Sequence, residues 1–411
     1  MNRREFLRKV TAAATAGAGS SFLSHLVLAG PIVRDPAELP SGARESALLA
    51  ALPDKVPLIK RTFRPPNFET PLSYFNEVFT PNEAFFVRYH MASIPEMNAR
   101  EWKLQIGGDS VAGPIELTLH DLKRNFEQVE IAAVNQCAGN RRGLVQPHVP
   151  GIQWGYGAMG NARWRGVRLK DVLNKAGVKK DALEVVANGA DAGLTAKLPD
   201  FAKSLPLWKA LDENTLIAFE MNGAPLPHWH GFPARLVVPG WTATYWMKHL
   251  SSLRVVSAPF DGFWMKTAYR VPKGAFPVPR EFDSQSSETT TPITDILVNS
   301  LVTNIENGQS FNSGQPIKVK GIAWDGGHGI DRVEISVDQG KSWRRADLQE
   351  DYGRFSWRQW HYEFQSEQPK GALKLMVRAT NRAGAMQPID PVPNPAGYHH
   401  NRIQTLELVI V

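Results

Sequence analysis

The chain has 411 residues, of which 43% are hydrophobic, and it contains a single cysteine. One cysteine excludes an intramolecular disulfide, a CxxC redox pair, and any cysteine-rich zinc site or iron–sulfur cluster. The formal net charge is +7, and no block of Lys or Arg suggests a nucleic-acid-binding surface. A chain of this length is predicted to form two or three domains, each with its own core.

The first 29 residues have the pattern of an export signal. Arg3 and Arg4 precede Phe-Leu and a weakly apolar run of Ala, Gly, Thr and Ser that ends near Ala29. A basic start, a short apolar run and small residues at a cleavage site are typical of a secretory signal rather than a membrane span. The adjacent arginines indicate the twin-arginine pathway. Residues 1–29 carry a net charge of +3, so their removal takes +7 to +4. We expect a periplasmic protein with no membrane span.

The rest of the chain has two sequence patterns, and the first combines strand-like and helix-like segments. Residues 30–75 are Pro-rich and irregular, which predicts an arm along the surface. Residues 76–283 combine short strands, such as 102–106, with a helix expected over Val167–Ala176 that ends at Gly177. This mixture has no regular βαβ rhythm and predicts an α+β domain.

The second pattern is made of strands and turns. The polar tract 284–291 predicts a linker. Within residues 292–411, alternating segments such as 317–322 and 333–337 are separated by turn residues such as Asp338-Gln339-Gly340. Short strands at regular spacing predict an immunoglobulin-like β-sandwich, here without the paired cysteines of antibody domains.

The single cysteine, Cys137, lies in the run Asn-Gln-Cys-Ala-Gly-Asn-Arg-Arg over residues 135–142. A short apolar strand leads to the cysteine, and a glycine-containing turn with two arginines follows. Cationic neighbours favour the thiolate, which is both a nucleophile and a metal ligand. An isolated cysteine is usually a small buried hydrophobe, but the polar and basic flank argues against that role. Thiol nucleophile and soft-metal ligand both stay open on these residues alone.

This run resembles the cysteine motif of the sulfite oxidase family of molybdenum enzymes. Four further segments match the family in the expected positions: Phe-Val-Arg-Tyr-His at 86–90, His-Gly-Phe-Pro-Ala-Arg at 230–235 with its continuation to 240, Trp-Arg-Gln-Trp at 357–360, and Asn-Pro-Ala-Gly-Tyr at 394–398. The matches cover most of the chain from about Phe85 and are closest to the bacterial periplasmic sulfite dehydrogenases. No segment resembles the haem domain of the animal enzymes, so we expect no haem in this chain.

The resemblance implies a metal site and an anion site. Cys137 would ligate molybdenum, with two more sulfurs supplied by the dithiolene of one molybdopterin per chain. Arg88, Arg142 and Arg358 would attract and orient sulfite, because a guanidinium offers paired donors and keeps its charge. Arg358, which lies between Trp357 and Trp360, could equally be stacked inside the sandwich.

Two aromatic residues complete the implied catalytic set. Trp154 matches the family's pocket tryptophan and would narrow access to small oxyanions. Tyr269 has the spacing of the family's active-site tyrosine, where its phenol would help to move protons. A buried core tyrosine is the alternative for Tyr269, and Tyr245 is a rival that the local sequence does not dismiss.

The resemblance also implies a set of residues that hold the pterin and its phosphate, because phosphate requires cationic and N–H donors. These residues are Phe86, Val87, Arg88, His90, Cys137, Asp191, His230, Arg235, Trp246, Met247 and Lys248. The histidine pairs 228/230 and 399/400 lack carboxylates or cysteines at ligand spacing, so we expect no zinc.

The family reaction is the oxidation of sulfite to sulfate, with the added oxygen coming from water. Since no CxxCH haem motif is possible with one cysteine, the electrons are expected to pass to a periplasmic c-type cytochrome. The sandwich resembles the family's dimerisation domain, which implies a homodimer. Two alternatives remain: the molybdenum subunit of a periplasmic sulfane-sulfur dehydrogenase complex, and a non-catalytic binding or assembly protein with a decayed site.

Overall fold

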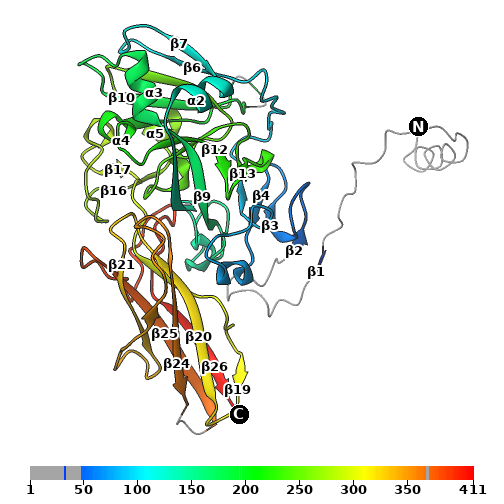
Figure 1. The fold of residues 1–411 in the computed structure, drawn as a ribbon. Coiled ribbons are helices and arrows are strands. Elements are labelled where there is room, and N and C mark those ends of the chain that lie inside the picture. Colours follow the sequence, from blue (N-terminus) through cyan, green and yellow to red (C-terminus); the bar gives the residue numbers. More distant parts are fainter. Residues whose placement is uncertain (1–31, 34–47, 194, 196, 367–369) are drawn as a thin grey trace, which may run out of the picture.

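The computed structural model describes residues 32–33, 48–193, 195, 197–366 and 370–411. The predicted export signal at 1–29 lies outside the described residues. Within the described part of the chain, no helix is long and apolar enough to cross a membrane. Figure 1 shows two bodies joined end to end, a mixed upper body and a lower body of strands.

A small antiparallel sheet includes four strands from the described part of the segment predicted to be an irregular arm. In order across the sheet, its strands are β1 (Ile32–Val33), β2 (Leu48–Ala50), β3 (Leu58–Thr62), β4 (Asn67–Glu69) and β5 (Val87–Arg88). Phe68 in β4 is opposite Val87 in β5, and both side chains are fully buried together with Leu58. The prediction of irregular structure was wrong for these strands. They form hydrogen bonds with one another and with a strand 20 residues further along the chain, so the local sequence alone does not show them.

The described residues of the α+β domain form two larger sheets and four short α-helices. One sheet has the order β11-β10-β15-β6-β7, with β6 (Lys103–Gly107), β7 (Ile115–Thr118), β10 (Glu184–Gly189), β11 (Ala202–Pro206) and β15 (Leu250–Val256). The other has the order β13-β12-β9-β8, with β14 also paired to β12; its strands are β8 (Gln128–Gln136), β9 (Met159–Arg168), β12 (Leu216–Met221), β13 (Ala224–Pro225) and β14 (Arg235–Val237). The helices are α2 (Leu119–Asn125), α3 (Leu169–Ala176), α4 (Leu207–Ala210) and α5 (Phe263–Lys266).

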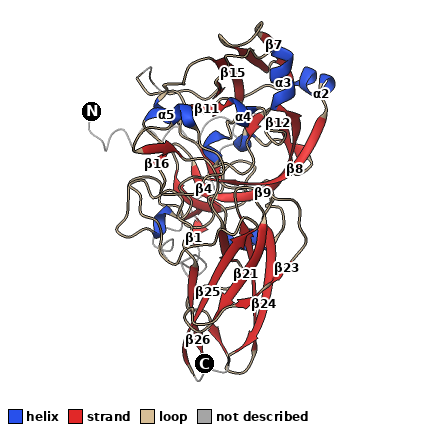
Figure 2. Ribbon diagram, turned by 90° about the vertical axis from the view of Figure 1, so that its left-hand side faces the viewer, coloured by secondary structure: helices blue, strands red, loops and turns tan. Residues whose placement is uncertain are grey.

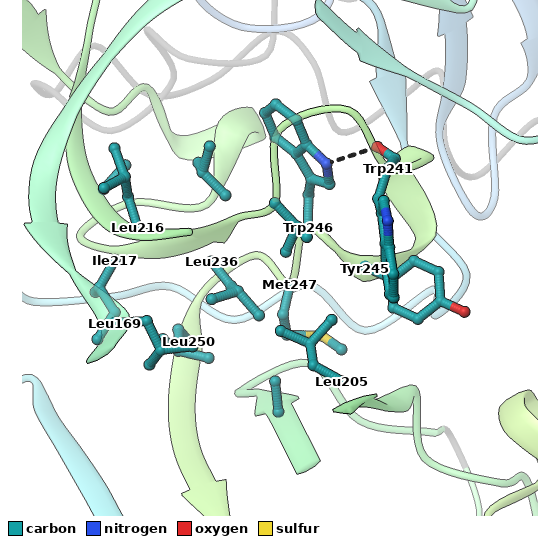
Figure 3. Packing of buried hydrophobic residues seen from close by; sticks show 14 of the residues in the cluster. Leu169, Leu205, Leu216, Ile217, Leu236, Trp241, Tyr245, Trp246, Met247 and Leu250 are labelled. Atoms are coloured by element: carbon teal, nitrogen blue, oxygen red, sulfur yellow. Dashed lines mark hydrogen bonds between the residues drawn. The ribbon is translucent and has the colours of Figure 1, made fainter. Parts of the chain in front are cut away.

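Helix α3 agrees with the prediction from its apolar spacing. Leu169, Val172, Leu173 and Ala176 are all buried, and Gly177 ends the helix in the left-handed conformation with φ of 72°. These side chains belong to one large core between the sheets. Figure 3 shows a part of this core around Trp246, whose indole Nε1 donates a hydrogen bond to the Trp241 carbonyl at 3.0 Å.

The C-terminal domain is a sandwich of two sheets, whose strands lie in the lower half of Figure 2. One sheet has the order β18-β20-β24-β23, with β18 (Asn299–Val302), β20 (Pro316–Trp324), β23 (Asp347–Leu348) and β24 (Arg358–Gln365). The other has the order β19-β26-β25-β21-β22, with β19 (Ser310–Phe311), β21 (Ile330–Ser336), β22 (Arg344–Arg345), β25 (Gly371–Asn381) and β26 (Gln404–Ile410). Alternate residues of both sheets are buried between them. The predicted order of an α+β domain followed by an all-β sandwich is confirmed.

The tract predicted to be a linker is part of the folded structure. It contains a 3₁₀ turn at Asp283–Gln285 and most of β17 (Thr290–Pro292), which pairs with β16 (Arg270–Pro272). Gln285 is buried, and its Nε2 donates to both carboxylate oxygens of Glu184 at 2.9 and 3.0 Å. At Gln285 the polar side chain therefore reflects a buried hydrogen bond to the first domain rather than an exposed connection.

Buried side chains of the two domains pack against each other, in addition to the chain that connects the domains. Phe75, Val134 and Met159 of the first domain pack in one buried cluster with residues of the second, including Trp324 and Trp357. The buried indole Nε1 of Trp324 donates to Oε1 of Gln136 at 2.6 Å, directly before the cysteine turn. The position of the cysteine is thus tied to the sandwich.

Candidate active site

Strand β8 and the turn after it fix the position of Cys137. β8 pairs with β9 along its whole length and ends at Gln136. The Cys137 N–H donates to the Ala158 carbonyl at 2.9 Å, and the side-chain oxygen of Asn140 accepts from the Ala158 N–H at 3.1 Å. A side chain at Gly139 would collide with the guanidinium of Arg142, so the turn packs against that arginine. Cys137 is buried, with 7% of its surface exposed.

Two cavities meet at this cysteine. We call them the inner cavity and the outer cavity, and the outer cavity, at about 380 Å³, is the larger. Four residues line both cavities: Arg88, His90, Cys137 and Tyr269. The inner cavity is also lined by other residues predicted to hold a pterin, namely Phe86, Asp191, His230, Arg235, Trp246, Met247 and Lys248. Trp154 and Arg142 line the outer cavity. The thiol lies at the junction of the two cavities.

The inner cavity is cationic. Arg235 is buried, its Nη1 donates to the His230 carbonyl at 3.1 Å, and its Nη2 donates to the Trp246 carbonyl at 3.0 Å. Burial lowers the pKa of Arg235 to about 9. Burial and the charge of Arg235 hold the pKa of Lys248 well below its usual value. Asp191 is the one carboxylate among the described residues that line this cavity, and burial raises its pKa to about 6 against the opposing effect of Lys248.

These groups fit an anionic, polar ligand. Buried cations without a matching anion are costly, and an anion that entered the cavity would restore ordinary pKa values. Within the described part of the chain, three buried polar atoms at this cavity have no hydrogen-bond partner: Nδ2 of Asn135, Nε of Arg235 and Oγ1 of Thr244. Donors and charge of this kind suit a phosphate group on a heterocycle that can accept and donate hydrogen bonds.

His90 and Tyr269 form a hydrogen-bonded pair at the junction of the cavities. The Tyr269 hydroxyl lies within hydrogen-bond distance of His90 Nε2, and the His90 ring stacks on Phe201 with centroids 3.7 Å apart. Burial and the charge of Arg88 hold the pKa of His90 well below its usual value, so the ring is neutral. Tyr269 has a φ of 59°, a strained backbone conformation for a tyrosine.

The rival tyrosine lies elsewhere. Tyr245 is fully buried beside Trp241 (Figure 3), with ring centroids 4.8 Å apart. It lines neither cavity, whereas Tyr269 lines both. The geometry therefore favours Tyr269 over Tyr245 as the site tyrosine.

The second domain closes the outer cavity. The Arg142 Nε donates to the Ala396 carbonyl at 2.6 Å, and its guanidinium lies over the Tyr398 ring at 5.1 Å. Tyr398 in turn stacks on Tyr269 with centroids 5.5 Å apart. Trp154 is fully buried at this cavity. Residues of both domains therefore line the same site.

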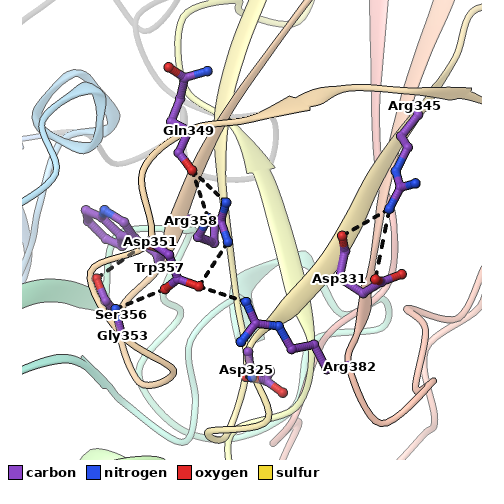
Figure 4. Close-up of polar contacts among 11 residues, drawn as sticks. Asp325, Asp331, Arg345, Gln349, Asp351, Gly353, Ser356, Trp357, Arg358 and Arg382 are labelled. Atoms are coloured by element: carbon purple, nitrogen blue, oxygen red, sulfur yellow. Dashed lines mark hydrogen bonds and ion pairs between the residues drawn. The ribbon is translucent and has the colours of Figure 1, made fainter.

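Two predicted site residues lie outside both cavities. Arg358 forms an ion pair with Asp351 at 3.0 Å, and its Nε and Nη2 donate to the Gln349 carbonyl at 3.0 and 2.6 Å (Figure 4). The prediction that Arg358 orients the substrate does not agree with this position, because the nearby carboxylate holds its charge at the surface of the sandwich. Val87 also lies outside both cavities. Successive side chains of a strand point to opposite faces, so Arg88 lines the cavities and Val87 packs in the core of the small sheet.

Sequence reasoning missed three residues at the site. Lys55 is buried, and its Nζ lies 2.5 Å from Nε2 of His230 while it donates to the Phe85 carbonyl at 2.9 Å. Burial lowers the pKa of Lys55 to about 7. Phe201 and Tyr398 line the inner and outer cavity, respectively. Tyr398 fell in a segment that resembles the family, but Lys55 came from the arm and carried no signal.

Two family models match the chain. One describes an oxidoreductase molybdopterin binding domain and covers residues 90–264, and the other describes a Mo-co oxidoreductase dimerisation domain and covers residues 290–406. The sulfite oxidase of Gallus gallus is 32% identical over 87% of this chain and 79% of its own length. The sulfite oxidase of Arabidopsis thaliana is 31% identical over 76% of this chain and 81% of its own.

A longer relative and one solved structure are also similar to this chain. The mitochondrial sulfite oxidase of Rattus norvegicus is 32% identical over 85% of this chain and 65% of its own length, so the chain spans a little under two thirds of that relative. The crystal structure of the sulfane dehydrogenase SoxCD from Paracoccus pantotrophus has a TM-score of 0.73 and 25% identity, and the match covers 95% of this chain and 93% of that one.

The fold, the cationic inner cavity and the matched models define a two-domain molybdopterin-binding protein. The chain belongs to the sulfite oxidase family of molybdenum-pterin enzymes. Its cofactor is molybdenum–molybdopterin, and the inner cavity has the cations and free donors that such a group requires.

Proposed function

We propose that this protein is a molybdenum-dependent sulfite dehydrogenase that oxidises sulfite to sulfate and passes the electrons to a c-type cytochrome. One observation carries the proposal: Cys137 lies where the cationic inner cavity opens into an outer cavity with Arg88 and Arg142. When bound, the cofactor supplies two-electron redox chemistry and oxygen-atom transfer to sulfur.

The residues of the inner cavity would hold the cofactor. Arg235 and Lys248 would bind its phosphate, and the free amide of Asn135 and the carboxylate of Asp191 would contact the pterin. Cys137 would be the protein's ligand to the metal, as a soft thiolate suits molybdenum. These contacts would bury the pterin in the inner cavity, next to Cys137.

Three residues would act on the substrate. Arg88 and Arg142 would attract sulfite and fix its oxygens, because both guanidinium groups line the outer cavity. Burial raises the pKa of the Tyr269 hydroxyl, so the phenol keeps its proton and can donate a hydrogen bond to a substrate oxygen. In the tautomer with the proton on Nε2, neutral His90 would donate to the phenol oxygen and leave the phenol proton for the substrate.

Location and partners belong to the same proposal. The twin-arginine pattern at 1–29 supports export to the periplasm, where a c-type cytochrome can accept electrons one at a time. The match of residues 290–406 to a dimerisation domain supports a homodimer.

The test uses protein purified after expression with a supply of the cofactor. We expect about one molybdenum per chain and sulfite-dependent reduction of ferric cytochrome c. Molybdenum-loaded protein that turns over no sulfite would contradict the proposed reaction. Protein that takes up almost no molybdenum would instead support the alternative of a non-catalytic binding or assembly protein.

A second candidate is a sulfane-sulfur dehydrogenase subunit. It is favoured by the likeness to the sulfane dehydrogenase SoxCD, which covers almost the whole of both chains. Cytochrome reduction with a protein-bound sulfane sulfur and none with free sulfite would identify this candidate and reject the first.

A further inference from the structure

The outer cavity is larger than a small inorganic anion requires. Its volume of about 380 Å³ lies within the range of roughly 300–1,000 Å³ found for sites that bind small organic molecules. Sulfite beside Arg88 would fill only a small part of this space. The remainder is available to a group attached to the sulfur.

Much of the wall of the outer cavity is aromatic. Trp154, Trp264, Tyr269 and Tyr398 all line it. Tyr269 and Tyr398 are nearly parallel, with an interplanar angle of 15°, and the Trp264 ring centroid lies 6.1 Å from that of Tyr269. Ile152 adds an aliphatic surface. Such a wall binds apolar groups through burial and ring contacts.

The charged groups of the outer cavity have a single sign. Among the described residues that line it, the charged side chains are Arg64, Arg88 and Arg142, and no carboxylate is present. The indole Nε1 of Trp154 is buried and has no hydrogen-bond partner in the described part of the chain. A buried donor beside guanidinium groups requires an acceptor such as an oxyanion. The cavity therefore suits an anion that also carries an apolar group.

We propose that the outer cavity binds organic sulfinates, R–SO₂⁻ with an apolar R group, and that the enzyme oxidises them to sulfonates. The inference rests on the proposed oxidation of sulfur at this site. A sulfinate keeps the sulfur lone pair and two oxygens of sulfite, and carbon replaces the third oxygen. The arginines hold the two oxygens, and the aromatic wall holds the R group.

The overall step is R–SO₂⁻ + H₂O → R–SO₃⁻ + 2 H⁺ + 2 e⁻. One S–O bond forms at the sulfur lone pair, and both O–H bonds of the water are broken. The sulfur is oxidised, and the two electrons reduce two equivalents of a one-electron acceptor, ferric cytochrome c. The protons leave to solvent.

The test compares methanesulfinate, benzenesulfinate and sulfite as substrates of the molybdenum-loaded full-length protein. We expect kcat/KM to be about tenfold higher for benzenesulfinate than for methanesulfinate, because only the phenyl group reaches the aromatic wall. Calorimetry gives a readout without turnover: benzenesulfonate should bind about tenfold more tightly than methanesulfonate. Ile152→Trp, which narrows the cavity, should remove both preferences, and Ile389→Trp, at a position 64% exposed on the second domain, is the matched control.

The outcomes separate the two proposals. Sulfite turnover with equal kcat/KM for the two sulfinates and equal binding of the two sulfonates would overturn the inference and leave the proposed function standing. Loss of turnover with sulfite and with both sulfinates in molybdenum-loaded protein would overturn both. Turnover of benzenesulfinate without turnover of sulfite would support the inference and reject the sulfite assignment.

Discussion

Replacing Arg358 with methionine should leave the oxidation of sulfite almost unchanged. Its guanidinium is held by Asp351 and by the Gln349 carbonyl, and it lines neither cavity. A partly exposed ion pair of this kind contributes about 0–1 kcal/mol to folding. We therefore expect kcat/KM for sulfite to change by about twofold or less, as for other substitutions far from the site.

Arg88→Met is the matched comparison. Arg88 lines both cavities, and Asn67 Oδ1 accepts from its Nη1 at 3.3 Å, which leaves other N–H groups for the substrate. A hydrogen bond to a charged group contributes roughly 1.5–3 kcal/mol, so the loss of two contacts with sulfite should cost about 3 kcal/mol or more. That loss corresponds to a decrease of about 100-fold or more in kcat/KM.

The assay is steady-state reduction of cytochrome c over a range of sulfite concentrations, with molybdenum content measured in each preparation. A fall in kcat/KM for Arg358→Met as large as that for Arg88→Met would refute the reasoning. It would mean that Arg358 reaches the substrate in the working enzyme and that its ion pair with Asp351 is not maintained.

Two further predictions concern stability. Gln285→Leu removes the donor to Glu184, so the free energy of unfolding should fall by about 1–3 kcal/mol in urea titrations, whereas a true linker position would show almost no change. Asp191→Asn should change the pH dependence of the apoprotein. Burial raises the pKa of Asp191 to about 6, so the folded chain holds this proton when the unfolded chain has lost it, and stability falls as pH rises from about 4 to about 6. That decline should be smaller in Asp191→Asn, and an unchanged slope would contradict the shift.

Periodic sequence patterns predicted the regular elements well. The apolar spacing of α3 and the alternation in β20 and β21 correspond to faces that are buried in the structure. Each of these elements buries one continuous face, so its own residues determine the pattern. Gln339 and Gly340 likewise have positive φ angles of 63° and 84°, as expected for the turn after β21.

Segments that depend on distant partners were not predictable in this way. β4 is three residues long and obtains its hydrogen bonds from β3 and β5, so no local pattern identifies it. Gln285 is polar because it binds a buried carboxylate 101 residues away, not because it is exposed. In both cases the sequence shows the composition of a loop, and the tertiary partner determines the structure.

The site residues also divide into those that the sequence located and those that only the folded structure brings to the site. The resemblance located segments near Cys137, Arg88 and Arg235, which the fold brings to one pair of cavities. It predicted Arg358 at the site, whereas the structure has this side chain outside both cavities, because a short motif does not show which face of a strand a side chain takes or which carboxylate lies beside it. Lys55 was missed because only the folded structure brings it against His230.

The most direct test of the central claim measures molybdenum content and sulfite-dependent cytochrome c reduction in wild type and in Cys137→Ser, prepared side by side. The wild type should contain about one molybdenum per chain and turn over sulfite. Cys137→Ser should lose turnover while its circular dichroism and unfolding transition stay close to those of the wild type, since only one sulfur atom changes. Sulfite turnover retained in Cys137→Ser, or absent from molybdenum-loaded wild type, would contradict the account.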